Sequence, residues 1–249
     1  MSPESISKSL RGTLGTQAKV AKTPDVMVKA SAQEGERLIM GLMGLFGKGP
    51  MSEKKIDKVA KLASNPFAQP DVRMREMQRL LQDGSEYAYR GLLKRFAANA
   101  NGQIADEDEK QWLEDAVVDV GERIRSPLEA FIRQNKTLSY ALRAYERIFG
   151  LQESVGFFLA ALEAHGPDAY RQSEAKQQLT LALIEHIDDE RVLPGLLPFV
   201  EDHSDDVRWA VLDGVERALA SGEFSDSVRE DYAQAMARIL QDDATGPRV

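Results

Sequence analysis

The side chains most often used in catalysis and metal binding are scarce in this chain. Its 249 residues include three histidines and no cysteine, which excludes thiolate nucleophiles, redox relays and Cys-ligated zinc. His186 with Asp188 and Asp189 is a spacing that could hold a metal ion. Its place at a predicted helix end favours a simpler interpretation, because His is stabilised at a helix C-terminus and Asp caps the following helix. We therefore predict no metal, no cofactor and no catalytic residue.

Acidic residues occur in short clusters, which could supply paired carboxylates for hydrolysis. None of them has the spacing and central Gly of an EF-hand loop. The clusters at 106–109, 188–190 and 201–206 lie at predicted helix starts, where carboxylates interact favourably with the helix dipole. We interpret them as helix-stabilising and predict that the protein is not an enzyme.

Charge divides the chain into a basic beginning and an acidic remainder. Residues 1–61 carry 11 Lys or Arg against 6 Asp or Glu, whereas residues 62–249 carry 21 against 34. We predict a flexible basic leader over 1–50, since 1–30 are rich in Ser, Thr, Gly and Lys and have no apolar stripe. Within it, 36–46 is predicted to be a short apolar amphipathic helix. Its most apolar run, 38–46, would span roughly 14 Å as a helix, too little to cross a bilayer.

From residue 51 onward the apolar spacing is that of helices in pairs. Val207, Val211 and Val215 illustrate it, since they share one helix face with small residues between them. Pairs beginning near 71, 108, 138, 174 and 206 give steps of about 30–37 residues, within the range of helical repeats. A turn is predicted at 83–85 and a helix end at 221–222. Pro194 and Pro198 are expected to bend one of the helices.

Two of these helix starts resemble the HEAT repeat. The run DDVRWAVL at 205–212 is similar to the Asp-x-Val-Arg signature of that family, and DVR at 71–73 repeats its beginning. The runs at 138–143 and 174–176 depart from the signature. The segments 89–96 and 106–110 also resemble a group of bacterial HEAT-repeat proteins of unassigned activity. The resemblance implies an all-α, right-handed α-solenoid of about five helix pairs over 51–249, in which the Asp and Arg of the signature link neighbouring units.

The resemblance also implies a function. Stacked HEAT units form a concave surface lined by their second helices, which is suited to binding another macromolecule. We predict a non-enzymatic, cytoplasmic scaffold or adaptor that binds another protein on this surface, and the sequence predicts no oligomeric state. The predicted contact residues come from the second helices of the first two units: Tyr87, Arg90, Lys94 and Arg133.

Two alternatives remain open at the level of the sequence. HEAT-like DNA glycosylases use a basic concave face, and the basic set available here is Arg73, Arg75, Arg79, Arg90, Lys94 and Arg95. The net charge of −8 argues against general nucleic-acid binding, and Trp112 is predicted to pack in the core. The second alternative is a membrane-associated adaptor that uses residues 36–46 and the basic leader.

Overall fold

The computed structural model describes residues 50–222 and 225–241, and this part of the chain is helical without a strand. The chain from Pro50 onward forms one compact unit. The predicted leader, including its apolar segment 36–46, lies outside the described residues except for Pro50. The α-helices are α2 (Glu53–Ala63), α3 (Pro70–Asp83), α4 (Glu86–Ala97), α5 (Gln103–Val120), α6 (Arg125–Gln134), α7 (Ser139–Phe149), α8 (Leu151–His165), α9 (Ser173–Ile184), α10 (Val192–Leu196), α11 (Asp205–Ser221) and α12 (Asp226–Gln241). Short 3-10 helices are η1 (Gly121–Ile124), η2 (Tyr170–Gln172) and η3 (Leu197–Glu201).

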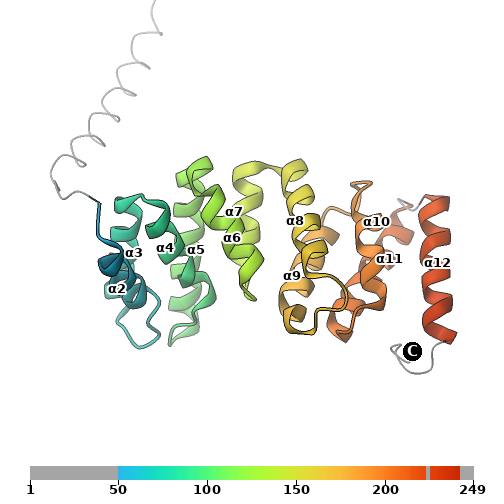
Figure 1. Ribbon diagram of the computed structural model, residues 1–249, viewed down its shortest axis with the longest axis horizontal. Coiled ribbons are helices and arrows are strands. Elements are labelled where there is room, and N and C mark those ends of the chain that lie inside the picture. The colour runs from blue at the N-terminus through green and yellow to red at the C-terminus, as the bar shows by residue number, and fades with distance from the viewer. Residues whose placement is uncertain (1–49, 223–224, 242–249) are drawn as a thin grey trace, which may run out of the picture. The chain divides into compact units, whose positions relative to one another are not determined.

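The predicted helix pairs correspond to α3/α4, α5/α6, α7/α8, α9/α10 and α11/α12 (Figure 1). In the first of them the chain reverses as expected, because Gly84 has a positive φ of 67° and the hydroxyl of Ser85 accepts a hydrogen bond from the amide of Ala88. In the fourth, α10 ends at Leu196 and the chain continues as η3. Pro198, which lacks the N–H that would extend the α-helical hydrogen bonds, lies in the first turn of η3, so the helix that was predicted to bend is instead divided into α10 and η3.

The helices form two rows. In the first row, α3 contacts α5, α5 contacts α7, α7 contacts α9, and α9 contacts α11. In the second row, α2 contacts α4, α4 contacts α6, α8 contacts α10, and η3 contacts α12. The guanidinium of Arg133 on α6 lies 4.7 Å from the ring centre of Phe157 on α8, which joins the two parts of the second row.

Apolar side chains from both rows form one hydrophobic core. Leu80, Leu113 and Leu142 contribute to it from the first row, and Leu92 and Leu128 contribute from the second. The helices of the two rows therefore bury their apolar faces in one shared core.

The crossing of α2 and α4 in the second row depends on a glycine. A side-chain carbon added at Gly91 on α4 would lie 3.0 Å from Cβ of Ala60 on α2. Alanine has no longer group that could rotate away, so the two helix backbones can approach only because residue 91 is glycine.

We expect Gly91→Val to lower the free energy of unfolding by about 2 kcal/mol, because the added atoms force α2 and α4 apart. The measurement is urea denaturation followed by circular dichroism. The matched control is Gly156→Val on α8, where the nearest atom to an added Cβ is the flexible end of Arg191 at 3.5 Å. The control should change stability by less than about 0.5 kcal/mol, and equal losses in both variants would contradict the assigned crossing.

Candidate functional site

The predicted contact residues lie on two adjacent helices of the second row. Tyr87, Arg90 and Lys94 follow one another on α4 at intervals of three and four residues, so they share one face. Arg133 lies on α6, which contacts α4. The structure thus brings the four predicted residues to neighbouring helices, with the side chains of Arg90 and Arg133 about half exposed at 55% and 48%.

Intramolecular partners hold three of these side chains. The hydroxyl of Tyr87 donates to the carboxylate of Asp57 on α2 at 2.9 Å. Arg90 donates to Glu86 at 2.5 Å, and Arg133 lies near Glu129. Ion pairs exposed to this degree contribute only about 0–1 kcal/mol, so a partner's carboxylate can replace them at little cost.

The contribution of α2 to this surface was not predicted from the sequence. Lys54, Asp57 and Lys61 are exposed and share one face of α2, as Tyr87, Arg90 and Lys94 share one face of α4. The contact between Asp57 and Tyr87 brings these two faces together. The spacing of the lysines on α2 indicates an exposed basic face, but the predicted helix pairs begin near residue 71 and do not include this helix. We call Lys54, Lys61, Arg90, Lys94 and Arg133 the basic surface.

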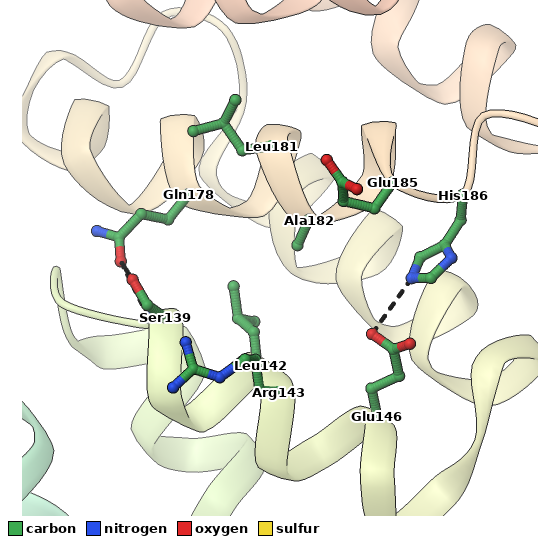
Figure 2. Close-up of a pocket in the computed structure, with 9 residues that line it drawn as sticks. All are labelled: Ser139, Leu142, Arg143, Glu146, Gln178, Leu181, Ala182, Glu185 and His186. Atoms are coloured by element: carbon green, nitrogen blue, oxygen red, sulfur yellow. Dashed lines mark hydrogen bonds and ion pairs between the residues drawn. The ribbon is translucent and has the colours of Figure 1, made fainter. Parts of the chain in front are cut away.

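A groove opens between α7 and α9 of the first row, with a volume of about 450 Å³ (Figure 2). Its apolar lining consists of Leu142 from α7 and Leu181 and Ala182 from α9. The polar side chains that line it are Ser139, Arg143, Glu146, Gln178, Glu185 and His186.

Hydrogen bonds close the two ends of the α7–α9 contact. At one end, the amide oxygen of Gln178 accepts from the backbone amides of Leu138 and Ser139 at 2.7 and 3.0 Å. At the other end, Nε2 of His186 lies 3.2 Å from Oε2 of Glu146 (Figure 2). Between these bonds the groove remains open.

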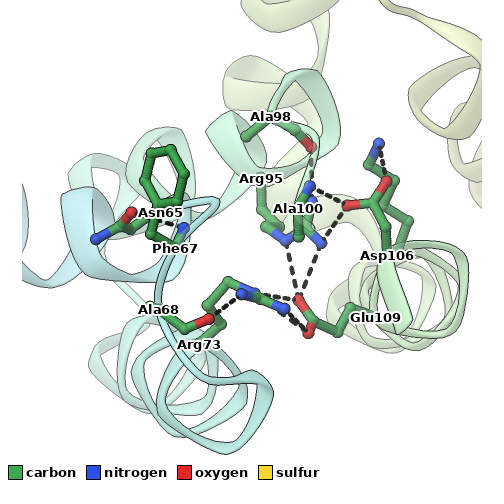
Figure 3. A network of polar contacts seen from close by, with 10 residues as sticks. Asn65, Phe67, Ala68, Arg73, Arg95, Ala98, Ala100, Asp106 and Glu109 are labelled. Atoms are coloured by element: carbon green, nitrogen blue, oxygen red, sulfur yellow. Dashed lines mark hydrogen bonds and ion pairs between the residues drawn. The ribbon is translucent and has the colours of Figure 1, made fainter. Parts of the chain in front are cut away.

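A buried polar cluster, separate from the basic surface and the groove, links three helices of the first two pairs. Arg73 on α3 and Arg95 on α4 both bind the carboxylate of Glu109 on α5, with shortest distances of 2.6 and 2.9 Å (Figure 3). Arg95 also binds Asp106 at 2.7 Å. The two arginine side chains are only 2% and 1% exposed. This cluster holds helices together and presents no charge to a ligand.

The buried cluster refines two interpretations of the sequence. Asp106 lies in the first turn of α5, as predicted, but it and Glu109 are also buried against arginines. In addition, Arg73 and Arg95 cannot belong to a nucleic-acid-binding face, because their guanidinium groups are enclosed and paired.

The histidines are dispersed. His186 binds Glu146, whereas the carboxylate of Asp189 is bound by Arg191 at 2.7 Å. Burial, with a smaller effect of nearby Lys176, lowers the pKa of His165. Among the residues that the structure describes, no three His, Asp or Glu side chains are grouped so that they could hold a metal ion.

The tryptophans occupy different environments. Trp112 is partly buried and packs against the hydrophobic core, as predicted. Trp209 on α11 is 55% exposed.

No helix in the described ranges 50–222 and 225–241 is long and apolar enough to cross a membrane.

Comparison of the chain with protein-family models, with curated proteins and with solved structures found no match.

The buried cluster predicts a large effect of one neutral substitution. Glu109→Gln removes the negative charge between Arg73 and Arg95 and leaves two buried cations with insufficient compensation. The free energy of unfolding in urea should fall by about 3–5 kcal/mol. The control is Glu107→Gln, an exposed residue on the same helix with a hydrogen bond to Gln103, which should cost less than about 0.5 kcal/mol. A loss below about 1 kcal/mol for Glu109→Gln would show that the cluster is not the link described here.

The same cluster predicts a pH dependence. Burial alone would raise the pKa of Asp106, but hydrogen bonds from Lys110, the amide of Ala100 and Arg95 outweigh it and lower the pKa below its ordinary value of 3.8. The ionised form therefore stabilises the fold above pH 3.8, and this contribution is lost as the pH falls through the lowered pKa.

The stability difference between the natural protein and Asp106→Asn should thus be largest above about pH 4 and shrink toward about pH 2. Urea denaturation across this range measures it. Asp108→Asn, on the exposed side of the same helix, is the control and should leave the profile unchanged. A difference for Asp106→Asn that is constant across the range would contradict the assigned electrostatic role.

Proposed function

We propose that the chain is a non-enzymatic, cytoplasmic scaffold or adaptor that binds an acidic segment of a partner protein on its basic surface. The observation that carries the proposal is the juxtaposition of the exposed faces of α2 and α4, established by the hydrogen bond between Asp57 and Tyr87. The face of α2 that carries Lys54 and Lys61 is thereby next to the face of α4 that carries Arg90 and Lys94, although the chain as a whole is acidic.

We further infer that the helix pairs form a HEAT-type solenoid, with the second row as its concave side. The contacts between successive helices of each row support this, as does the position of Arg73, which binds Glu109 of the next pair. Side-chain links between pairs join residues that are 32, 36 and 42 apart in the sequence, separations close to one repeat. This arrangement leaves the outer face of the second row free for a long contact.

A protein segment fits the basic surface better than nucleic acid does. Carboxylates of Asp57, Glu86 and Glu129 alternate with the cations, and a continuous phosphate backbone would be repelled by them. A peptide with spaced acidic residues can bind the cations while its other residues pass the carboxylates. Tyr87, 37% exposed, adds an aromatic side chain of the kind enriched in protein interfaces.

The double variant Arg90→Glu with Lys94→Glu tests the proposal. The tagged full chain is used to capture proteins from an extract, and the captured proteins are quantified by mass spectrometry. The matched control is Lys136→Glu with Arg171→Glu, which makes the same charge change at two exposed positions outside α4, one in the loop before α7 and one in η2. We expect at least one protein to bind the natural chain and the control variant and to be reduced tenfold or more on the first variant, because repulsion replaces attraction.

Identical captured proteins for all three baits would exclude the basic surface as the binding site. Loss of nucleic acid rather than protein from the first variant, with salt-dependent DNA binding by the natural chain, would instead favour the nucleic-acid alternative. Circular dichroism of each variant establishes that the helices are retained.

A further inference from the structure

We propose that the groove between α7 and α9 is a second docking site, which takes one amphipathic α-helix of a partner protein carrying Lys or Arg at one end of its apolar face. The groove lies in the first row, and the basic surface lies in the second. The proposal therefore does not depend on the function assigned to the basic surface.

The groove leaves part of its apolar lining exposed. Leu181, in the last turn of α9, is 43% exposed and lines the groove together with the half-buried Ala182 and the buried Leu142 of α7 (Figure 2). Aliphatic side chains gathered on the two walls of one groove offer a partner apolar area to bury. Each square ångström of apolar surface that the partner covers contributes to binding.

The dimensions of the groove fit a helix. On α7 the lining residues run from Ser139 to Glu146, and on α9 they run from Gln178 to Glu185, in both cases at intervals of three and four. The groove therefore runs along the two helices for about two turns, or roughly 10 Å. A furrow between two neighbouring helices accepts the ridge of side chains of a third helix.

The charges at one end select the partner. Glu146 lies in the last turn of α7 and Glu185 directly follows α9, so both carboxylates lie where the two helices end. Their side chains are 40% and 69% exposed. The C-terminal carbonyl groups of a helix add a partial negative charge at the same end. A Lys or Arg of the bound helix would meet two carboxylates and two helix ends there.

The present partners of these carboxylates leave room for such a cation. Glu146 accepts one contact from His186, and Glu185 accepts one from Arg217, each at 3.2 Å. Each carboxylate has two oxygens and can accept further hydrogen bonds. At the opposite end, the guanidinium of Arg143 is bound to Glu114 at 2.8 Å and so does not oppose a cation near Glu146.

The experiment uses two synthetic amphipathic helical peptides of about five turns. Both carry the same Leu and Ala face, flanked by Lys in one peptide and by Glu in the other. Fluorescence anisotropy measures their binding to the full chain. We expect saturable binding of the Lys peptide and at least tenfold weaker binding of the Glu peptide. Absence of saturable binding of the Lys peptide, or equal binding of both, would overturn the proposal.

Two pairs of variants locate the binding. Leu181→Asp should weaken binding of the Lys peptide tenfold or more, whereas Leu219→Asp, at another exposed leucine of the first row, should leave it within twofold. Glu185→Lys should weaken it at least fivefold, and Glu163→Lys, at an exposed residue of α8, should weaken it less than twofold. All four positions are exposed, so the fold should be retained, as circular dichroism can establish. Equal effects within either pair would show that the peptide binds by general charge attraction outside the groove.

Discussion

The structure depends on buried cations near the starts of first-row helices, each of which binds a carboxylate in the next helix pair or in the loop just before it. Arg73 reaches forward to Glu109 at 2.6 Å, and Lys176 reaches forward to Asp202 at 2.5 Å. Both cations also donate to backbone carbonyl groups in the loop before their own helix. Arg73 donates to the carbonyl of Ala68, and Lys176 donates to the carbonyl of Pro167. A buried charge tolerates only a precise partner. These contacts therefore fix the order and spacing of neighbouring pairs, which apolar packing alone would leave adjustable.

Much of the helical organisation could be predicted from the sequence, because the residues that determine a helix lie within it or next to it in the sequence. Apolar spacing, the turn at Gly84 and the prolines of the fourth pair act within a few residues of the features that they determine. The role of Lys176 could not be predicted in this way. The run at 174–176 departs from the Asp-Val-Arg pattern, yet Lys176 lies in the first turn of α9 as Arg73 does in α3. The two helices share a buried cation in the first turn, and the partner of each cation is distant in the sequence.

The candidate site, too, could be predicted only where it depends on residues that are close in the sequence. That Tyr87, Arg90 and Lys94 share a face follows from helical spacing alone. That Asp57 lies against Tyr87 depends on how α2 crosses α4, which the close approach at Gly91 determines. The groove between α7 and α9 is further from prediction, because it depends on how two helices from different pairs pack against each other. No residue type or spacing in either helix signals this.

Pairing inside the fold also decides which charges a partner meets. Helix α5 is rich in Asp and Glu, but Asp106, Glu109 and Glu114 are buried and bound by cations from neighbouring helices. These acidic side chains stabilise the contacts between helix pairs and contribute little to the electrostatic field at the protein surface. The lysines of α2, by contrast, are exposed on the surface. A chain with a formal charge of −8 can still offer a basic surface on one row and an acidic groove end on the other, because net charge does not determine how charges are distributed over the surface.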